Sequence, residues 1–256
     1  PNQSSIYADL GYVLIEQNRL DEAIVQLSLA VKLNPYNLPA HEHLARAYFR
    51  QDKYELAIIE YERLLNIIYL EIASKRISET QRGADVVRIY RDMAVVYHAL
   101  GLYDEAICYS QLSRDIGGDS LQHIRLLLSL DRIGPAVGLL KAGVAVTGSE
   151  TPAPTLLDYG IALVAAKDFN KGGQALDRAL SAATGDAESR SFARLIKLKL
   201  AADAGDHNEE ELIFQSLKDE NPLLCEGGEI NAPLYWPTDL VNDLVEVQKS
   251  IDRMCN

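Results

Sequence analysis

One stretch near the amino terminus decides the fold: residues 4–37 read SSIYADLGYVLIEQNRLDEAIVQLSLAVKLNPYN. In its first half, side chains that share one helical face recur every three or four positions: Tyr7, Leu10, Gly11 and Leu14. A second such face follows in Ala23, Leu27 and Ala30. Asn18 separates the two faces, and Asn34-Pro35 closes the unit because proline cannot continue a helix. The stretch predicts two helices packed as a hairpin, which the small residues Gly11 and Ala23 allow to approach closely.

The same pattern recurs along the chain. Thirty-four residues on, it reads His41, Leu44, Ala45 and Tyr48, then Ala57, Tyr61 and Leu64. A third copy reads Tyr90, Met93, Ala94 and Tyr97, then Gly101 and Ala106. A fourth, shortened near Gly117-Gly118, is marked by Ile124, Leu127 and Ala136, and a fifth by Leu156, Tyr159, Gly160, Leu163, Gly172, Leu176 and Ala179. A sixth is inferred from Leu198, Ala201, Gly205, Phe214, Leu217 and Pro222, with Glu210 where a small residue is expected.

This pattern resembles the tetratricopeptide repeat (TPR) family over residues 4–222. The resemblance implies an all-α fold, a right-handed superhelical solenoid of about six helix-turn-helix repeats that start near residues 4, 38, 87, 117, 153 and 191. An insertion at 72–86 breaks the period, and we expect the preceding helix to run on to about Glu79 before Gly83 ends it. A loop at 223–237 leads to a helix at 238–254, whose apolar face is expected to cap the solenoid: Leu240, Leu244, Val247 and Ile251.

The resemblance also implies that the first helices of the repeats line a concave groove for a protein or peptide ligand. The inward positions predicted to bind a partner are Tyr12, Arg46, Phe49, Arg50, Arg88, Arg91, His98 and Arg125. Arginine offers a planar set of donors that suits carboxylates, and aromatic side chains anchor many interfaces, so the groove suits an acidic segment with apolar anchors. The alternative is that these arginines pair with neighbouring Glu or Asp and only tie repeats together.

One ligand of the family is not expected. Some TPR domains hold the C-terminal carboxylate of heat-shock chaperones with Lys and Asn side chains on three successive first helices. The matching positions here are Ala8, Tyr12, His43, Arg88 and Asp92. Only Arg88 suits that task, so a heat-shock chaperone C-terminus is not expected to bind.

Composition limits the partners and the compartment. The net charge of −12 argues against nucleic acid, and no apolar run reaches the roughly 18–20 residues of a membrane span, so a soluble protein is expected. A chain that begins at Pro1 without a signal-peptide pattern is expected to be trimmed, so targeting information is missing. Three cysteines favour a reducing, cytoplasmic home, with a periplasmic or lumenal one left open. We expect Cys108 to pack in the interior, and a Cys225–Cys255 disulfide, left open, would pin the terminal helix.

No residues point to catalysis. His41 and His43, two apart on a helix, face different directions, and no Cys/His spacing suggests a metal or cofactor. A non-enzymatic adaptor or scaffold for complex assembly is therefore expected, which binds a segment of a partner in the groove. The alternative is a permanent structural subunit or a self-associating scaffold that uses the extended helix around residues 58–80. Its apolar seam comprises Ile58, Tyr61, Leu65, Ile68 and Ile72.

Overall fold

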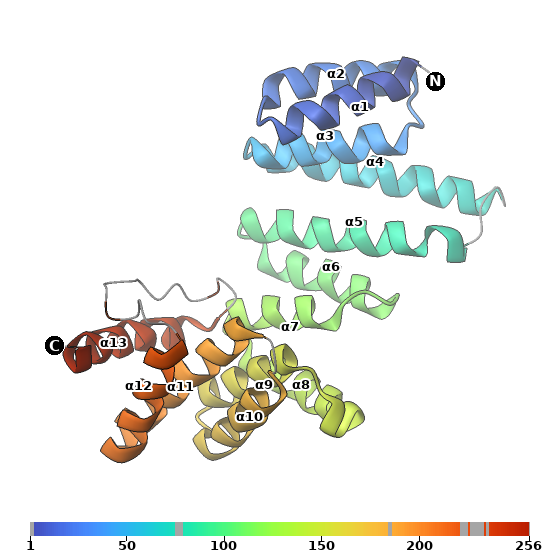
Figure 1. Ribbon diagram of the computed structural model, residues 1–256. Helices are drawn as coiled ribbons and strands as arrows, with labels where there is room; N and C mark the ends of the chain where they lie inside the picture. Colours follow the sequence, from blue (N-terminus) through green and yellow to red (C-terminus); the bar gives the residue numbers. More distant parts are fainter. Residues whose placement is uncertain are drawn as a thin grey trace. The chain divides into compact units, whose positions relative to one another are not determined.

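The computed structural model describes residues 3–74, 79–183, 186–220, 225, 233 and 236–255, apart from the side chains of residues 79–82 and Ser250. The described residues contain helices and no strand, which confirms the all-α prediction (Figure 1). The helices are α1 (Gln3–Glu16), α2 (Leu20–Leu33), α3 (Leu38–Arg50), α4 (Tyr54–Ala73), α5 (Glu79–Ala99), α6 (Tyr103–Asp115), α7 (Ser120–Ser129), α8 (Ile133–Thr147), α9 (Ala153–Ala165), α10 (Phe169–Ala182), α11 (Ala187–Ala204), α12 (His207–Glu220) and α13 (Thr238–Cys255), with one 3₁₀ turn, η1 (Gly148–Glu150).

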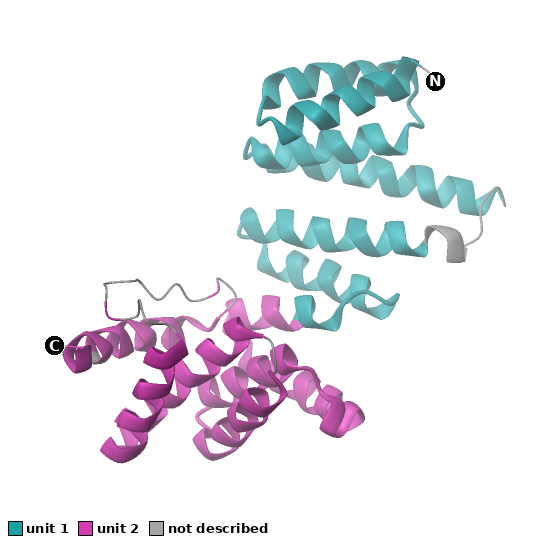
Figure 2. Ribbon diagram, in the orientation of Figure 1, with its two compact units in different colours: residues 1–123 teal, residues 124–256 magenta. Residues whose placement is uncertain are grey.

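The chain forms two compact units, residues 1–123 and 124–256 (Figure 2). In unit 1, α1 packs on α2, α3 on α4 and α5 on α6, and successive hairpins stack through α2 on α3 and α4 on α5. In unit 2, α9 packs on α10 and α11 on α12, with α8 stacked on α9 and α10 on α11. Each unit is therefore a stack of helical hairpins, as the repeats predict.

Each turn between the two helices of a hairpin contains one residue in the left-handed backbone region. These residues are Asn18, Asp52, Gly101, Asp131, Lys167 and Gly205, with φ between 53° and 75°. The next N–H donates to a carbonyl five residues earlier, as from Arg19 to Leu14 at 2.9 Å and from Asp168 to Leu163 at 2.9 Å. Glycine, asparagine and aspartate tolerate this backbone, whereas a lysine does so at a cost of about 1–2 kcal/mol.

Small residues stand where the helices of a hairpin cross. A Cβ on Gly11 would lie 2.4 Å from Cγ of Leu27, and one on Gly160 would lie 2.8 Å from Cγ of Leu176. Ala23, in the second helix of the first hairpin, is fully buried. The small residues of the repeat are therefore a steric requirement of close helix packing.

The prediction for the extended helix was wrong at its end. Helix α4 ends at Ala73, and the hydroxyl of Ser74 donates to the carbonyl of Glu71 at 3.0 Å, which offers the backbone an alternative to another helical turn. Gly83 lies inside α5, which already begins at Glu79. The insertion thus lengthens two helices, and its residues 75–78 lie outside the described residues.

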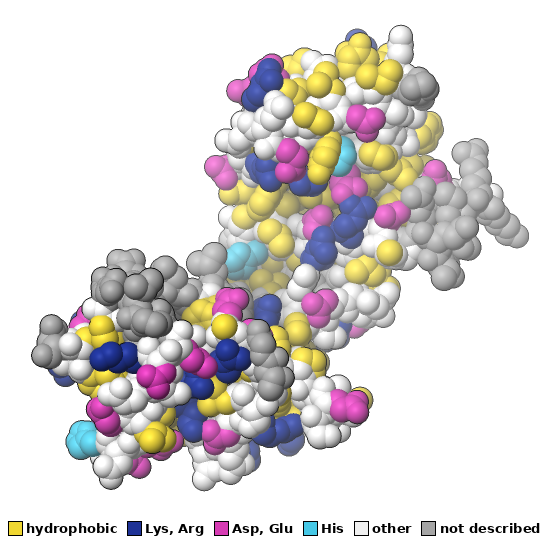
Figure 3. All heavy atoms as spheres, viewed as in Figure 1, with side chains coloured by type: hydrophobic (Ala, Val, Ile, Leu, Met, Phe, Trp, Pro, Cys, Tyr) yellow, Lys and Arg dark blue, Asp and Glu magenta, His cyan; other side chains and the backbone are white. Residues whose placement is uncertain are grey.

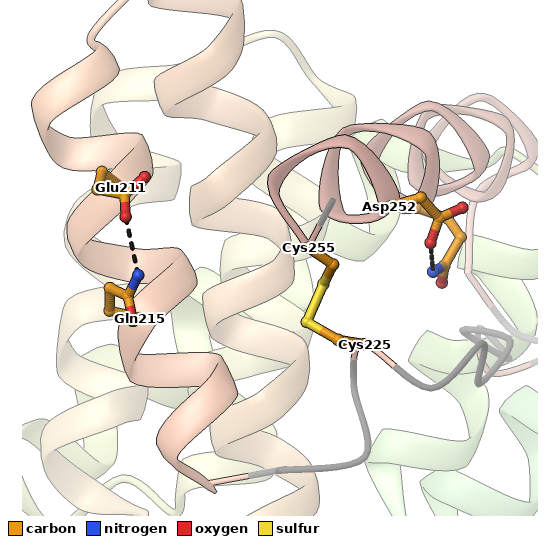
Figure 4. Close-up of a disulfide and its surroundings, with 6 residues drawn as sticks. Glu211, Gln215, Cys225, Asp252 and Cys255 are labelled. Carbon is orange, nitrogen blue, oxygen red and sulfur yellow. Dashed lines mark hydrogen bonds between the residues drawn. A yellow bond between two sulfur atoms is a disulfide. The ribbon is translucent and has the colours of Figure 1, made fainter.

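Helix α13 covers part of unit 2. It packs on α11 through four apolar residues, Leu240, Leu244, Val247 and Ile251. The same core cluster contains Trp236, whose ring lies 5.0 Å from that of Phe192. Cys225 and Cys255 form a disulfide across a Cα–Cα distance of 5.5 Å (Figure 4). Pro222 and most of the predicted 223–237 loop lie outside the described residues. The pairing removes the argument for a reducing compartment that rested on the odd cysteine count.

The expectation that Cys108 packs in the interior was wrong, because its side chain is exposed on α6. The buried face of α6 consists of Ala106, Ser110 and Ser113. A residue two positions after Ala106 points to nearly the opposite side of the helix, which leaves Cys108 in solvent.

We predict that removal of the disulfide destabilises unit 2. A Cys225→Ser/Cys255→Ser variant should lose about 2–4 kcal/mol of unfolding free energy, since the bond closes a loop with a sequence separation of 30. Urea unfolding of the oxidised protein gives the comparison, and Cys108→Ser is the matched control that should change little. A non-reducing peptide map without a Cys225–Cys255 link would contradict the assignment.

We also predict that Lys167→Gly stabilises the protein by about 1 kcal/mol, since glycine adopts the left-handed backbone of this turn without strain. Lys141→Gly, at an exposed position inside α8, should instead cost about 1 kcal/mol. Both are measured by thermal and urea unfolding, and equal effects of the two substitutions would refute the strain at Lys167.

Candidate functional site

Two first helices of unit 1 line a cavity of about 410 Å³, hereafter the α3–α5 pocket. Four of the eight residues predicted to bind a partner meet there: Arg46, Phe49, Arg88 and Arg91. The other lining residues are Glu42, Tyr61, Asp92, Val95 and Val96. The pocket therefore combines arginines with apolar side chains, as predicted, but it also contains two carboxylates.

Helical spacing explains why these residues share the pocket. Glu42, Arg46 and Phe49 lie four and three positions apart on α3, so they follow one face of that helix. Arg88, Arg91 and Val95 follow one face of α5 in the same way. The opposite sides of both helices are buried in the core of unit 1, which leaves this face outward.

Ion pairs join the arginines to neighbouring acids. Arg88 pairs with Glu42 across the two helices, and also with Asp85 at 3.1 Å. Arg91 pairs with Asp92 at 2.9 Å, the adjacent residue of α5. Arg46 reaches Glu16 of α1 at 3.4 Å. The pairing of arginines with neighbouring acids, which was the alternative to partner binding, is therefore seen in the structure, because Arg88 and Arg46 link successive repeats.

The pairs do not bury the arginines. All three side chains keep about a third or more of their surface in solvent, and such pairs contribute only about 0–1 kcal/mol each. Among the lining residues, three arginines stand against Glu42 and Asp92, which leaves one net positive charge in a chain of net charge −12. The pocket is therefore basic relative to the rest of the protein. Over the surface of unit 1 as a whole, basic and acidic side chains are interspersed (Figure 3).

Tyr12, also predicted to bind a partner, does not line the pocket but lies beside its residue Arg46. The Tyr12 ring lies 5.0 Å from that of His43, and the Arg46 guanidinium lies 6.0 Å from the Tyr12 centroid. Burial and the Arg46 charge lower the pKa of His43. The charges of Asp9 and Glu16 act in the opposite direction and raise it.

Tyr61 is a pocket residue that the sequence pattern did not predict. Its ring lies in the core of unit 1, yet it also lines the pocket. Burial raises the pKa of its phenol well above the ordinary value, so the hydroxyl stays neutral. The sequence did contain a signal for this role. Tyr61 stands at a core position of the second helix where other repeats have Leu27 or Leu176.

The remaining predicted residues lie outside the pocket. Arg50 donates to the backbone carbonyl of Ile15 at 2.9 Å and so ties α3 to the end of α1. The His98 ring is exposed and lies 5.6 Å from that of Tyr103. Arg125 belongs to unit 2, where its Nε donates to the fully buried Asp158 at 2.9 Å and joins α7 to α9.

His41 and His43 make different contacts, as expected for side chains two positions apart on a helix. His41 is buried, with Nδ1 2.7 Å from Glu60 and Nε2 3.0 Å from the carbonyl of Pro35. In the described ranges, no three His, Cys, Asp or Glu side chains are grouped as metal ligands. None of the helices described is long and apolar enough to span a membrane.

Comparisons by sequence agree with the repeat pattern. A TPR repeat family model matches residues 11–52, and a tetratricopeptide repeat model matches residues 38–68. A similar curated protein is the chloroplastic tetratricopeptide repeat domain-containing protein PYG7 of Arabidopsis thaliana, 28% identical over 95 residues. The match covers 36% of this chain and 30% of that relative, so it spans less than a third of the relative's length.

Solved structures with a similar fold are TPR proteins. PilW, a type IV pilus biogenesis factor, has a TM-score of 0.56 at 16% identity, over 87% of this chain and 96% of PilW. YrrB, a TPR protein with an unusual peptide-binding site, has a TM-score of 0.51 at 15% identity, over 75% of this chain and 90% of YrrB. A tetratricopeptide repeat protein of Parabacteroides merdae has a TM-score of 0.54 at 12% identity, over 97% of this chain and all of that one. At these identities the likeness shows the fold alone.

We predict that His43 titrates below the ordinary histidine value, and that Arg46→Gln raises its pKa by removing a positive charge beside it. Because the folded-state pKa is lowered, the unfolded chain takes up this proton first, so stability should fall as pH drops below the ordinary value of about 6.5. Chemical shifts of the His43 ring measure the first effect. Urea unfolding between about pH 7.5 and about pH 5.5 measures the second, where His43→Gln should weaken the dependence. A His43 pKa at or above the ordinary value would contradict both.

Proposed function

Because the chain is a member of the tetratricopeptide repeat superfamily, whose fold serves protein–protein interaction and scaffolding, we propose that it is an adaptor for complex assembly. It binds a segment of a partner protein in the α3–α5 pocket. The superfamily consists generally of non-enzymatic interaction modules, and the proposal assigns no catalytic residue. The observation that carries the proposal is the pocket itself, where partly exposed arginines surround apolar surface.

The contacts of the arginines favour a carboxylate as one feature of the ligand. The ion pair of Arg46 with Glu16 is long, at 3.4 Å, and Arg91 is paired with the residue next to it. Both side chains keep about a third or more of their surface in solvent, so an incoming carboxylate can form a charge-assisted pair with them. Such a pair gains strength as the bound segment excludes water from the pocket.

The apolar surface of the pocket favours an apolar anchor as the second feature. Phe49 is half-buried against Tyr54, with ring centroids 5.6 Å apart, and Val95 is exposed at the pocket wall. A cavity of about 410 Å³ is large enough for one or two side chains. We therefore expect a segment that carries an acidic residue close to an aromatic or aliphatic one. The peptide-binding site named for YrrB and the type IV pilus biogenesis role named for PilW are consistent with this proposal.

A self-associating scaffold is the second candidate function. The structure changes which residues of α4 could form the contact surface between copies. The seam residues Ile58, Tyr61, Leu65, Ile68 and Ile72 all pack in or against the core of unit 1, so they are not available for contact. At the end of α4, Leu70 and Tyr69 are instead the exposed large apolar side chains, at 62% and 45%. Light scattering at micromolar concentration separates the candidates, because this second one requires an oligomer that Leu70→Gln weakens.

We predict that charge reversal in the pocket weakens partner binding without unfolding the protein. Affinity capture from the native source identifies the bound segment, and fluorescence titration then measures it as a synthetic peptide. Arg46→Glu/Arg91→Glu should lower the affinity by at least about tenfold, or about 1.4 kcal/mol, since both substitutions replace donors with carboxylates.

The control for this experiment is Lys32→Glu, a charge reversal at an exposed position of α2. It should leave the affinity unchanged, and circular dichroism should show the same helix content in every variant. An affinity that is equal for the wild type and the double variant would refute the pocket as the binding site.

A further inference from the structure

Unit 2 contains an equivalent of the α3–α5 pocket. The left-handed residues of the turns align the repeats, because each stands at the same place between the two helices of a hairpin: Asp52 and Gly101 follow α3 and α5, as Lys167 and Gly205 follow α9 and α11. Six of the positions that line the pocket on α3 and α5 correspond in this register to Leu157, Ile161, Val164, Phe192, Leu195 and Lys199. We call these six residues of unit 2 the α9–α11 face.

The α9–α11 face is covered, whereas the pocket of unit 1 is open. Its four aliphatic side chains are at most 7% exposed. At the places of Ile161 and Lys199, unit 1 has the partly exposed Arg46 and Val95, and Val95 is 51% exposed. The four aliphatic side chains belong to one core cluster with Trp236 and with residues of α13. Unit 2 therefore fills the place that unit 1 leaves open for a ligand.

The segment that fills this place belongs to the same chain. The Trp236 ring lies 5.0 Å from that of Phe192, and the carboxylate of Asp243 lies 3.8 Å from the Lys199 ammonium. Trp236 and Asp243 are seven positions apart, as are Phe192 and Lys199 on α11. The segment that leads into α13 therefore runs along α11 in the same direction, over about two helical turns.

A helix that only continued the stack of hairpins would pack differently. In unit 1, α3 and α5 pack on the second helix of the preceding hairpin, α2 and α4. Helix α13 packs instead on a first helix, α11, and the described residues show no comparable packing of α13 on α12 (Figure 1). Its start reaches the turn after α7, where the N–H of Thr238 donates to Asp131 at 3.3 Å. Helix α13 thus has the position of a ligand of the face rather than that of a further repeat.

The side chains of α13 show which chemistry the face accepts. Those that recur every three or four positions along one side of α13 are apolar and at most 3% exposed: Leu240, Leu244, Val247 and Ile251. Trp236 stands four positions before the first of them, and Asp243 brings a carboxylate to Lys199. Val245 is 54% exposed, so only one side of the helix is used. The pattern describes an amphipathic helix with an aromatic residue before it and one acidic residue beside its apolar side.

We propose that the α9–α11 face is a second binding site, which takes an amphipathic helix of a partner protein with this pattern, and that α13 is its internal ligand. Residues 221–237 connect α12 to α13, and a connection longer than about 12–15 residues is uncommon in a compact domain and is frequently functional. The Cys225–Cys255 bond ties the other end of α13 (Figure 4). A linked helix competes at an effective concentration on the order of millimolar, so the partner helix binds once α13 is weakened.

A fluorescent peptide of residues 236–254 tests the proposal on the full chain. The oxidised wild type should bind it weakly, because its own α13 fills the site. In the open variant, Cys225→Ser/Cys255→Ser/Leu244→Gln, α13 loses its covalent tie and one core side chain. The matched control carries Val245→Gln in place of Leu244→Gln and keeps the core of α13. We expect the open variant to bind the peptide at least about tenfold more tightly than the control in fluorescence anisotropy.

A charge exchange then locates the peptide. A peptide with Asp243→Lys should bind the open variant about threefold less tightly, and Lys199→Glu in the open variant should reverse this preference. If Leu244→Gln lowers the helix content in circular dichroism, Asp243→Lys in the full chain takes its place, since it repels Lys199 and keeps the apolar residues of α13.

Other outcomes overturn the proposal. Equal affinity of the open variant and its control, or no binding to either, would make α13 a fixed part of the core of unit 2. A dimer of the open variant in light scattering without peptide would assign the face to α13 of a second copy. Loss of binding on Arg46→Glu/Arg91→Glu would place the peptide in the α3–α5 pocket. The first two outcomes leave the α3–α5 pocket as it stands, because that pocket lies in unit 1.

Discussion

The close crossing of two helices within each repeat is the constraint on which the rest of the structure depends. At Gly11 and Gly160 there is no room for a Cβ, because a leucine of the second helix occupies that space. The chain must also reverse direction within a few residues, and the left-handed residues between the helices allow this. A hairpin built in this way buries only part of its apolar surface. The rest is buried by stacking on the next hairpin, which makes the fold a stack rather than a single globule.

In unit 1, stacking gives the first helices α3 and α5 three faces with different tasks. One contacts its own second helix, one contacts the preceding hairpin, and one faces outward. On α3 and α5 the outward faces hold Arg46, Phe49, Arg88 and Arg91, which together form the pocket.

Electrostatics decide how available these surfaces are. The pocket arginines have acidic neighbours, but partly exposed pairs of this kind are weak, so a carboxylate from a partner can replace an internal one at little cost. Arg125 differs, because its partner Asp158 is fully buried and would be costly to leave unpaired. Arg125 is therefore paired with a buried carboxylate, whereas Arg46 and Arg91 are paired with carboxylates that are partly exposed.

The sequence by itself determined the helical repeats, their turns and their small crossing residues, because these depend on spacing along the chain. The resemblance to the repeat family also implied which face of α3 and α5 carries the arginines, and positions three and four apart do share a face. It did not determine what lies across from that face. Only the tertiary structure showed that Tyr61 lines the pocket, that Arg50 donates to the carbonyl of Ile15, that α4 ends at Ala73, and that Cys225 meets Cys255. The reason is physical: periodicity sets the direction of a side chain from its own helix, whereas its partner depends on how separate helices approach each other.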